Sequence, residues 1–468
     1  MSNYNGENNL TSSKPCSQVE CLIAAGLQSR ILLPRDEGYA ARIESYWCNS
    51  AKLQPACIVQ PASSLEVSKA VKALADADQV FAVRAGGHSN WAGSNNIDGG
   101  VTIDLGLLSS TTYDPATERA HIAPAVKWKN VYAELEKHGR VVAGGREAEV
   151  GAGGFLLGGG NTFYTMRYGL ACDSVLAYEV VLSDGRIITA DADGENAELF
   201  RVLKGGGNNF GIVTRFTMRT LPSGPLWGGF AVKPMTVMPA AAKAIEDFIT
   251  NLRSDPDSSL NFTVCHMPRF GGGAVVTVLN NVAGVIDMYE FEMEFTDSGV
   301  DNVWYTLCFK NDASIIAKTN ELHSQLASEV QGKVSDDDFR THCSFQPIPK
   351  AVGEQSMAMG GNILGLDRYP HDAVLIQVNV SLRTRELADW ARPRVRGVID
   401  SVRRFAETID NGVSPWLYMN YASPDQEVLQ SYGPENVRKM KEAAIKYDPR
   451  GVFQRLCLGG FKIAAIKD

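Results

Sequence analysis

Apolar residues recur at helical spacing in some parts of the chain and alternate with polar residues in others. Val67, Val71 and Leu74 follow a capping box formed by Ser63 and Glu66, which predicts a helix. The alternation through 101–105 predicts a strand. In the first half of the chain, further strands are predicted at 80–84, 175–182 and 186–190, and helices at 126–137 and 197–204. A hairpin turn at 183–185 joins the last two strands.

After Pro222 glycine becomes less frequent and the predicted elements lengthen. The alternation from Val374 to Leu382 is clean, with Gln377, Asn379 and Ser381 on the face opposite the apolar residues. Further strands are predicted at 274–279, 288–295 and 416–421, and helices at 240–252, 388–405 and 434–446. Strands and helices mixed in this way predict an α+β fold with an antiparallel sheet.

The composition sets limits on function. The chain has 468 residues, of which 44% are apolar and 21% charged, and its net charge is −8 without a basic run. We therefore expect no nucleic-acid partner. No segment is long and apolar enough to span a bilayer, and no CxxC or HExxH motif indicates a metal site. An acidic protein that binds an anionic ligand must use local hydrogen-bond donors.

Three glycine-rich stretches, at 84–89, 151–160 and 205–211, could supply such donors. Glycine lets backbone N–H groups turn toward a ligand and lets the chain approach it closely. One such stretch alone is usually no more than a tight turn, but three that each follow a strand-like run favour a nucleotide site. Neither the Rossmann nor the Walker spacing of glycines is present.

Five ordered motifs identify a family resemblance. They are Arg84-Ala-Gly-Gly-His-Ser89, Val150-Gly-Ala-Gly-Gly154, Leu157-Gly-Gly-Gly160, Tyr168-Gly-Leu-Ala-Cys-Asp173 and the run from Gly205 to Thr214. Together they resemble the FAD-binding module of the vanillyl-alcohol-oxidase superfamily, in its berberine-bridge-enzyme-like branch. Within this branch the sequence is similar to fungal oxidases of secondary metabolism, such as solanapyrone-synthase-like enzymes.

The resemblance implies a two-domain fold with FAD as cofactor. We expect an N-terminal segment at 1–33, a PCMH-type FAD domain at 34–222, and a substrate domain at 223–404 built on an antiparallel sheet covered by helices. A C-terminal segment at 405–468 should return to the FAD domain. The expected FAD-binding residues are Arg84, Ala85, Gly86, Gly87, His88, Ser89, Val150, Gly151, Gly153, Gly154, Asp173, Gly211, Ile212, Val213 and Asn420. Of these, we expect Arg84 to be structural rather than a phosphate ligand.

The resemblance also implies how the flavin is attached. His88 matches the histidine that forms a covalent bond to the isoalloxazine, and a neutral imidazole is a suitable nucleophile. The position of the second tether, a cysteine in many members, is Glu147 here, so attachment through His88 only is expected. Val150 matches a position at which valine accompanies reaction of the reduced flavin with dioxygen.

Four side chains are expected to carry catalysis. Tyr421 matches the catalytic tyrosine of cannabinoid-synthase-like members, and Tyr418 is its neighbour. A regular strand would aim these two tyrosines at opposite faces, so either the strand is irregular or only one tyrosine serves. Gln377 and Asn379 lie near the position at which berberine bridge enzyme carries a glutamate base. The present sequence has no carboxylate at that position.

Cysteines bear on localisation. Four of the nine, at positions 16, 21, 48 and 57, fall in the first sixty residues. They predict one or two disulfides, with Cys21 and Cys57 as the expected pair, and hence a secretory or extracellular protein. The first fourteen residues show no signal peptide. The alternative is four unpaired thiols.

We therefore expect an FAD-dependent oxidase that takes a hydride from a small, apolar natural product and passes electrons to dioxygen. The substrate would be an alcohol or another activated C–H compound, and an oxidative cyclisation could follow. The rival hypotheses are a flavin-bearing isomerase or cyclase without net redox change, and a flavin-binding protein without chemistry. The expected oligomeric state is a monomer or weak dimer.

Overall fold

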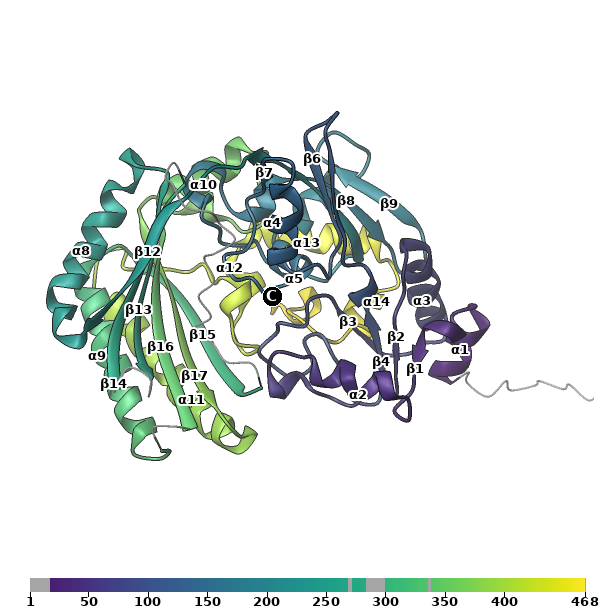
Figure 1. The fold of residues 1–468 in the computed structure, drawn as a ribbon, viewed down its shortest axis with the longest axis horizontal. Helices are drawn as coiled ribbons and strands as arrows, with labels where there is room; N and C mark the ends of the chain where they lie inside the picture. Colours follow the sequence, from purple (N-terminus) through teal and green to yellow (C-terminus); the bar gives the residue numbers. More distant parts are fainter. Residues whose placement is uncertain (1–16, 268–271, 283–298, 336–337, 468) are drawn as a thin grey trace, which may run out of the picture.

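The structure is a computed structural model that describes residues 17–267, 272–282, 299–335 and 338–467. It consists of two groups of sheets with helices packed around them (Figure 1). Residues 17–222 and the C-terminal helices form one group, and a large sheet with its helices forms the other. The α+β class predicted from the sequence is confirmed. The predicted strand at 288–295 lies outside the described residues.

The first group contains a four-stranded sheet in the order β1-β2-β4-β3 and a five-stranded sheet in the order β5-β6-β10-β8-β9. Their strands are β1 (Ile31–Leu32), β2 (Cys57–Val59), β3 (Phe81–Arg84), β4 (Val101–Asp104), β5 (Thr111–Asp114), β6 (Arg119–Ile122), β8 (Val175–Val181), β9 (Ile187–Asp191) and β10 (Ile212–Arg219). A short pair, β7 (Arg140–Val141) and β11 (Leu221–Pro222), accompanies them. The predicted hairpin is confirmed, because β8 and β9 pair antiparallel and Gly185 between them has a φ of 89°.

The same group contains several helices. They are α1 (Gln18–Ala24), α2 (Glu37–Glu44), α3 (Ser64–Asp76), α4 (Trp128–Glu136), α5 (Ala152–Leu157), α6 (Thr165–Tyr168) and α7 (Ala197–Leu203). In α3 the Ser63 hydroxyl accepts a hydrogen bond from the Glu66 N–H, and Val67, Val71 and Leu74 are fully buried. The amphipathic pattern therefore predicted both the helix and the face that it buries.

The second group is built on a seven-stranded antiparallel sheet in the order β12-β14-β13-β16-β17-β15-β18. Its strands are β12 (Trp227–Pro234), β13 (Ser258–Met267), β14 (Gly272–Asn281), β15 (Asp301–Lys310), β16 (Phe339–Ile348), β17 (Ala373–Leu382) and β18 (Val413–Ser414). In β17, Val374, Ile376 and Val378 belong to the core beneath the helices. Gln377 on the other face lines a cavity. The alternation predicted from the sequence thus separates core from cavity.

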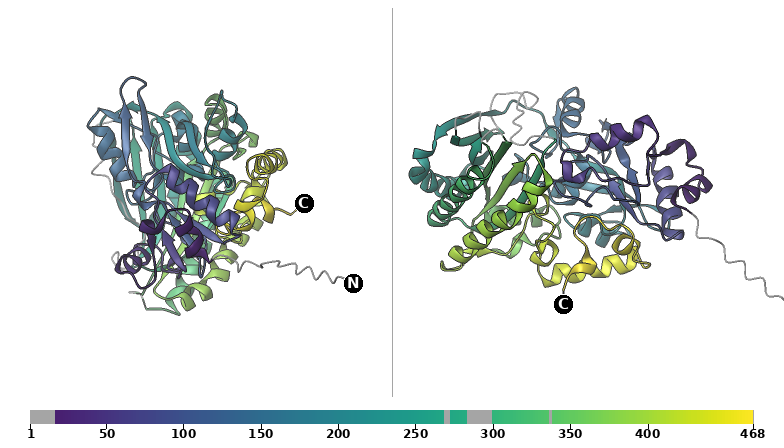
Figure 2. Two further views of the ribbon diagram at one scale, coloured as in Figure 1. Left: turned by 90° about the vertical axis from the view of Figure 1, so that its right-hand side faces the viewer. Right: turned by 90° about the horizontal axis from the view of Figure 1, so that it is seen from below.

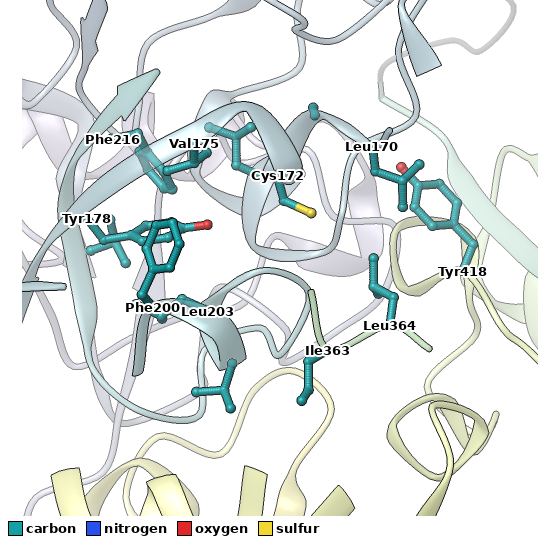
Figure 3. Packing of buried hydrophobic residues seen from close by; sticks show 14 of the residues in the cluster. Leu170, Cys172, Val175, Tyr178, Phe200, Leu203, Phe216, Ile363, Leu364 and Tyr418 are labelled. Carbon is teal, nitrogen blue, oxygen red and sulfur yellow. The ribbon is translucent and has the colours of Figure 1, made fainter. Parts of the chain in front are cut away.

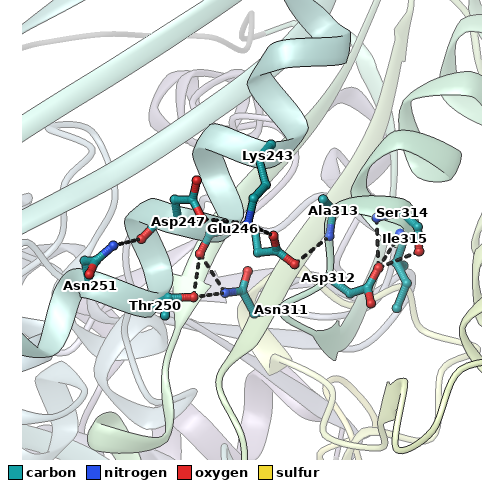
Figure 4. Close-up of polar contacts among 10 residues, drawn as sticks. All are labelled: Lys243, Glu246, Asp247, Thr250, Asn251, Asn311, Asp312, Ala313, Ser314 and Ile315. Carbon is teal, nitrogen blue, oxygen red and sulfur yellow. Dashed lines mark hydrogen bonds and ion pairs between the residues drawn. The ribbon is translucent and has the colours of Figure 1, made fainter.

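Three helices cover the outer face of this sheet: α8 (Met238–Asn251), α9 (Ala313–Gln331) and α11 (Arg385–Ala406). A polar corner ties α8 to the start of α9 (Figure 4). Asn311 Nδ2 donates to the Glu246 carbonyl oxygen at 2.9 Å, and Asp312 caps α9 by accepting from the Ser314 N–H at 2.8 Å. A shorter helix, α10 (Lys350–Ala358), follows β16. The helices therefore fix the sheet so that its other face points toward the first group.

The C-terminal part lies against the first group (Figure 2). It contains α12 (Val428–Ser431), α13 (Pro434–Tyr447) and α14 (Val452–Arg455). The Phe81 N–H of β3 donates to the Leu456 carbonyl oxygen at 2.9 Å, and Ser183 Oγ donates to Asp448 at 2.8 Å. These contacts join the C-terminal part to the first group, whereas α11 and β18 (Val413–Ser414), which run past residue 404, belong to the second. The domain division at 222 and 404 stays a proposal.

One element in this region differs from the prediction. The segment 416–421 is not a strand: Trp416 and Tyr418 are buried in the core, and a 3-10 turn runs from Met419 to Tyr421. Figure 3 shows the Tyr418 ring beside Leu170 and Leu364 in that core. Trp416 and Tyr418 are two residues apart, as in a strand, but the turn that begins at Met419 ends this alternation before Tyr421.

The predicted disulfide between Cys21 and Cys57 is not formed, and no disulfide joins cysteines within the described parts of the chain. Cys57 is a free, buried thiol whose pKa is raised to about 12 by burial. Cys21 donates its S–H to the Gln18 carbonyl oxygen. Both side chains pack as small apolar groups in the core around α1 and α3. Cys16 lies outside the described residues, and the secretory localisation stays a prediction. None of the helices described here has the length and apolarity that crossing a bilayer requires.

Candidate functional site

A cavity of about 440 Å³ lies between the two groups of sheets, where the loops of the first group face the large sheet. Its volume is within the range typical of small-molecule sites. Its wall includes most of the predicted residues: Ala85, Gly86, Gly87, His88, Ser89, Val150, Gly151, Gly153, Gly154, Gly211, Ile212, Val213, Gln377, Tyr418, Asn420 and Tyr421. The structure thus brings together segments that lie more than three hundred residues apart in the sequence.

His88 lies on the cavity wall at the end of the turn that follows β3. Its ring stacks on Trp47, with centroids 4.4 Å apart and 14° between the planes. The Trp47 N–H also donates to the Gly87 carbonyl oxygen at 3.1 Å, so this tryptophan fixes both ring and turn. Burial lowers the pKa of His88 to about 3, and the nearby Lys127 ammonium adds to the shift. The imidazole is therefore neutral at physiological pH.

Two glycine turns meet beside His88. The Gly86 and Gly151 backbones cross so closely that a Cβ on Gly86 would lie 2.5 Å from the Gly151 Cα. Lys127 donates from Nζ to the Gly86 carbonyl oxygen at 2.7 Å, and its own backbone bridges to Gly151. Burial lowers the pKa of Lys127 to about 8. Only glycine at both positions permits this crossing.

Several backbone donors at these turns have no acceptor in the part of the chain that the structure describes. They are the N–H groups of Gly86, Gly87, Ser89 and Gly154. A Cβ on Gly154 would meet nothing within 4 Å, because this residue faces open space. Unpaired amides grouped at two glycine turns can bind an anionic group.

The two tyrosines differ in their surroundings. The Tyr418 hydroxyl is buried and accepts hydrogen bonds from the Asn161 N–H at 2.7 Å and from Asn420 Nδ2 at 3.1 Å. Burial raises its pKa. The Tyr421 ring meets the Tyr418 ring edge to face, with centroids 4.8 Å apart. The 3-10 turn therefore lets both tyrosines reach the cavity, which a regular strand could not do.

Arg146 and Gln346 were not predicted from the sequence. Arg146 Nη2 donates to Gln346 Oε1 at 2.6 Å and lies 3.4 Å from Tyr421 Oη. Gln346 Oε1 also accepts from Asn161 Nδ2 at 3.0 Å, and Gln346 Nε2 donates to Tyr421 Oη at 3.2 Å. Arg146 directly precedes Glu147, which stands where many members of the family that the sequence resembles carry a second flavin tether. This position next to Glu147 was the one feature of the sequence that could have predicted Arg146 as a site residue.

The large sheet contributes a polar wall. Gln377 is 6% exposed, lines the cavity, and has no hydrogen-bond partner for its Nε2 among the described residues. His342 beside it also lines the cavity, and burial lowers its pKa to about 4. Further lining residues from the sheet are Ser259, Asn261, Asn280, Trp304 and Ser344. Most of these side chains are uncharged hydrogen-bonding groups.

Three predicted residues lie outside the cavity wall. Arg84 is buried with its guanidinium over the Tyr46 ring, and donates to the Arg42 carbonyl oxygen at 2.7 Å. Asp173 is buried and accepts hydrogen bonds from the Leu170 N–H and from Ser356 Oγ of α10, the latter at 2.6 Å. Burial raises the pKa of Asp173. Asn379 donates to Ser381 Oγ at 3.1 Å within the sheet. These contacts hold backbone and side chains near the cavity in place.

Comparison with known proteins relates the chain to flavoproteins. A family model described as an FAD binding domain matches residues 55–191. The chain is 34% identical over 458 residues to an FAD-dependent monooxygenase, drtC, from Aspergillus calidoustus, covering 92% of this chain and 87% of that protein.

Solved structures share the fold. The 6-hydroxy-D-nicotine oxidase of Arthrobacter nicotinovorans matches with a TM-score of 0.72 at 22% identity, covering 91% of this chain and 96% of that one. The berberine bridge enzyme of Eschscholzia californica matches with a TM-score of 0.73 at 15% identity, covering 96% and 100%. The PCMH/VAO-type fold expected from the sequence motifs is confirmed.

Proposed function

The chain belongs to the berberine-bridge-enzyme-like family of FAD-dependent oxidoreductases, and we propose that it is an oxidase that removes a hydride and a proton from a small natural product. The observation that carries this proposal is the neutral His88 ring on the cavity wall, beside two glycine turns with unpaired amides. When bound, FAD supplies a two-electron acceptor that takes the hydride and passes both electrons to dioxygen, which leaves as hydrogen peroxide.

The residues present fit FAD. Its pyrophosphate requires several hydrogen-bond donors that approach closely, and Gly86, Gly87, Ser89 and Gly154 offer N–H groups that no described group accepts. A Cβ would find open space at Gly154, as expected where a ligand lies against the backbone. We propose that these four amides hold the pyrophosphate, and that the adenine end extends toward the start of β10.

His88 is proposed as the covalent tether. A nucleophilic imidazole must be unprotonated, and the pKa of about 3 keeps it so at any physiological pH. The stacked Trp47 ring limits rotation of the imidazole and so directs its free nitrogen. Glu147, in the place of the family's second tether, has no nucleophilic sulfur. We therefore propose attachment through His88 alone.

Tyr421 is proposed as the group that accepts the substrate proton. A guanidinium donor next to a phenolic oxygen stabilises negative charge on that oxygen, and Arg146 Nη2 lies 3.4 Å from Tyr421 Oη. The Tyr418 hydroxyl is already bonded to two donors, and burial opposes its ionisation. We assign it the role of anchoring the loop at Asn161. Dioxygen is proposed to reach the site past Val150, which also lines the cavity.

Two other reactions are considered beside oxidation, namely monooxygenation and a cyclisation or isomerisation. Relatives such as drtC carry the name monooxygenase, which would require one oxygen atom of dioxygen in the product. A cyclase or isomerase would consume no dioxygen at all.

The test is a screen of phenolic acids, allylic alcohols and primary alcohols with purified protein under ¹⁸O₂. An oxidase forms one hydrogen peroxide per oxidised product and no labelled product. Labelled product would identify a monooxygenase, and product without oxygen uptake an isomerase or cyclase. A colourless protein would refute FAD binding. A yellow protein that turns over nothing under any condition would favour the non-catalytic alternative.

A further inference from the structure

Arg146 is a cation in the cavity wall for which the described residues supply no anionic partner. It lines the cavity, and no carboxylate among the described residues lies within ion-pair distance of it. The guanidinium donates to two neutral groups, Gln346 Oε1 and Tyr421 Oη. A part-buried charge without a counter-ion is costly, so this site favours a ligand that supplies one.

The Arg146 guanidinium is fixed in position and still has N–H donors that form no hydrogen bond with a described residue. Gln346 Oε1 accepts from Arg146 and from Asn161, so its position is fixed from two sides. Arginine carries five N–H donors, and the bonds to Gln346 and Tyr421 both use Nη2. The remaining donors are the Nε–H and the two Nη1–H groups, each of which can donate a single hydrogen bond to a carboxylate or enolate oxygen.

A second unpaired donor lies on the sheet nearby. Gln377 Nε2 is buried, has no acceptor among the described residues, and belongs to a side chain on the cavity wall. Gln346 pairs with Leu375 in the sheet, so Gln377 is its diagonal neighbour, about 7–8 Å away between side-chain origins. Because Arg146 Nη2 bonds to Gln346 Oε1, a ligand at the guanidinium lies on the same stretch of cavity wall as Gln377. A buried amide N–H left unpaired is costly, which gives the second contact a driving force.

We propose that this cavity takes an acidic, oxygen-rich substrate, whose ionised carboxylate or enolate oxygen binds Arg146 while a second oxygen accepts from Gln377. This inference rests on the proposed function and replaces the apolar substrate expected from the sequence. Arg146 is here a specificity-determining residue, since a neutral analogue of the same shape leaves its charge unpaired.

The experiment measures binding of non-reacting probes to the flavin-containing protein. Benzoate and benzamide have the same shape and differ in charge, and dimedone is an enolised cyclic 1,3-dione. Binding is followed by the flavin difference spectrum and independently by calorimetry. We expect benzoate to bind about 10- to 100-fold more tightly than benzamide, the range given by one charge-assisted hydrogen-bond pair. Dimedone binding above that of cyclohexanone would extend the class to enolates, and benzoate preference alone would restrict it to carboxylates.

Variants assign the preference to the guanidinium. Arg146→Gln should bring the benzoate-to-benzamide ratio near one, and Arg146→Lys should retain part of it. Arg140→Gln is the matched control, because Arg140 pairs with Glu118 outside the cavity, and should leave the ratio unchanged. Gln377→Leu should weaken salicylate, which carries a second oxygen, more than benzoate.

The two proposals fail in different ways. Equal binding of benzoate and benzamide by wild-type protein, or an unchanged ratio in Arg146→Gln, overturns the acidic substrate class and leaves the oxidase proposal intact. Absence of flavin from the purified protein overturns the proposed function, and calorimetry then still reports whether Arg146 selects the anion.

Discussion

Replacing Tyr421 by Phe removes one hydroxyl from the cavity and keeps the ring that packs against Tyr418. The hydroxyl's contacts to Gln346 and Arg146 are 3.2 and 3.4 Å long, and these two partners also bond to each other. We therefore expect a stability loss below about 1 kcal/mol. If Tyr421 accepts the proton, flavin reduction should slow by about 10²–10⁴-fold, which corresponds to roughly 3–5 kcal/mol in the barrier.

Tyr418→Phe is the matched comparison. For this variant the structure predicts a larger loss of stability and a smaller loss in the rate of flavin reduction than for Tyr421→Phe. Its hydroxyl is the acceptor for the buried Asn161 N–H at 2.7 Å. Removing that acceptor leaves a buried donor unpaired, which costs about 1–3 kcal/mol of unfolding free energy. Since this hydroxyl is proposed only to anchor the loop, flavin reduction should slow less than in Tyr421→Phe.

The assay is anaerobic stopped-flow reduction of the flavin by substrate, together with denaturant unfolding of both variants. Reoxidation of the dithionite-reduced variants by dioxygen is the control and should match wild type, because neither change alters access near Val150. A larger kinetic loss in Tyr418→Phe would move the proton acceptor to that residue. Wild-type reduction rates in both variants would refute a tyrosine base and direct attention to Gln377 or to the substrate itself.

Further predictions concern the flavin link and buried ionisable groups. Acid precipitation should leave the yellow chromophore with the protein, and His88→Ala should release it to the supernatant; a flavin that washes out of wild type would contradict the covalent link. No flavin-bearing tryptic peptide should contain Cys172, whose thiol is fully buried in the core and absent from the cavity wall. His323 is 1% exposed and burial lowers its pKa to about 3, so only the unfolded chain takes up its proton as pH falls below 6.5. Stability should therefore be level above that pH and decrease below it by up to about 1.4 kcal/mol per pH unit for this residue. His323→Gln should flatten the curve by that amount in denaturant titrations at pH 7, 5.5 and 4.5, and an unchanged slope would argue against a buried neutral histidine.

Local signals predicted the wall that carries the glycine turns. The close crossing at Gly86 and Gly151 requires glycine whatever surrounds it, so the motif is visible in the sequence. The strand from Ala373 to Leu382 was equally clear, because burial of one face imposes strict alternation. In both cases the constraint acts within a few residues.

What the sequence did not reveal depends on contacts between distant segments. Arg146 and Gln346 are two hundred residues apart, and only the packing of the large sheet against the first group joins them. The turn at Met419 was missed because aromatic residues in a core resemble a strand. The Cys21–Cys57 pairing failed for a related reason, since buried thiols also pack as apolar groups.

The two faces of the large sheet let stability and selectivity change separately. Ser344 and Gln377 face the cavity, whereas their neighbours Cys343 and Val378 are buried beneath the helices. Divergence within such a family can therefore proceed through every second residue of a strand, with little effect on folding. A mutagenesis library restricted to these cavity-facing positions should yield mostly folded proteins with altered selectivity, and one displaced by a single residue should yield mostly aggregates.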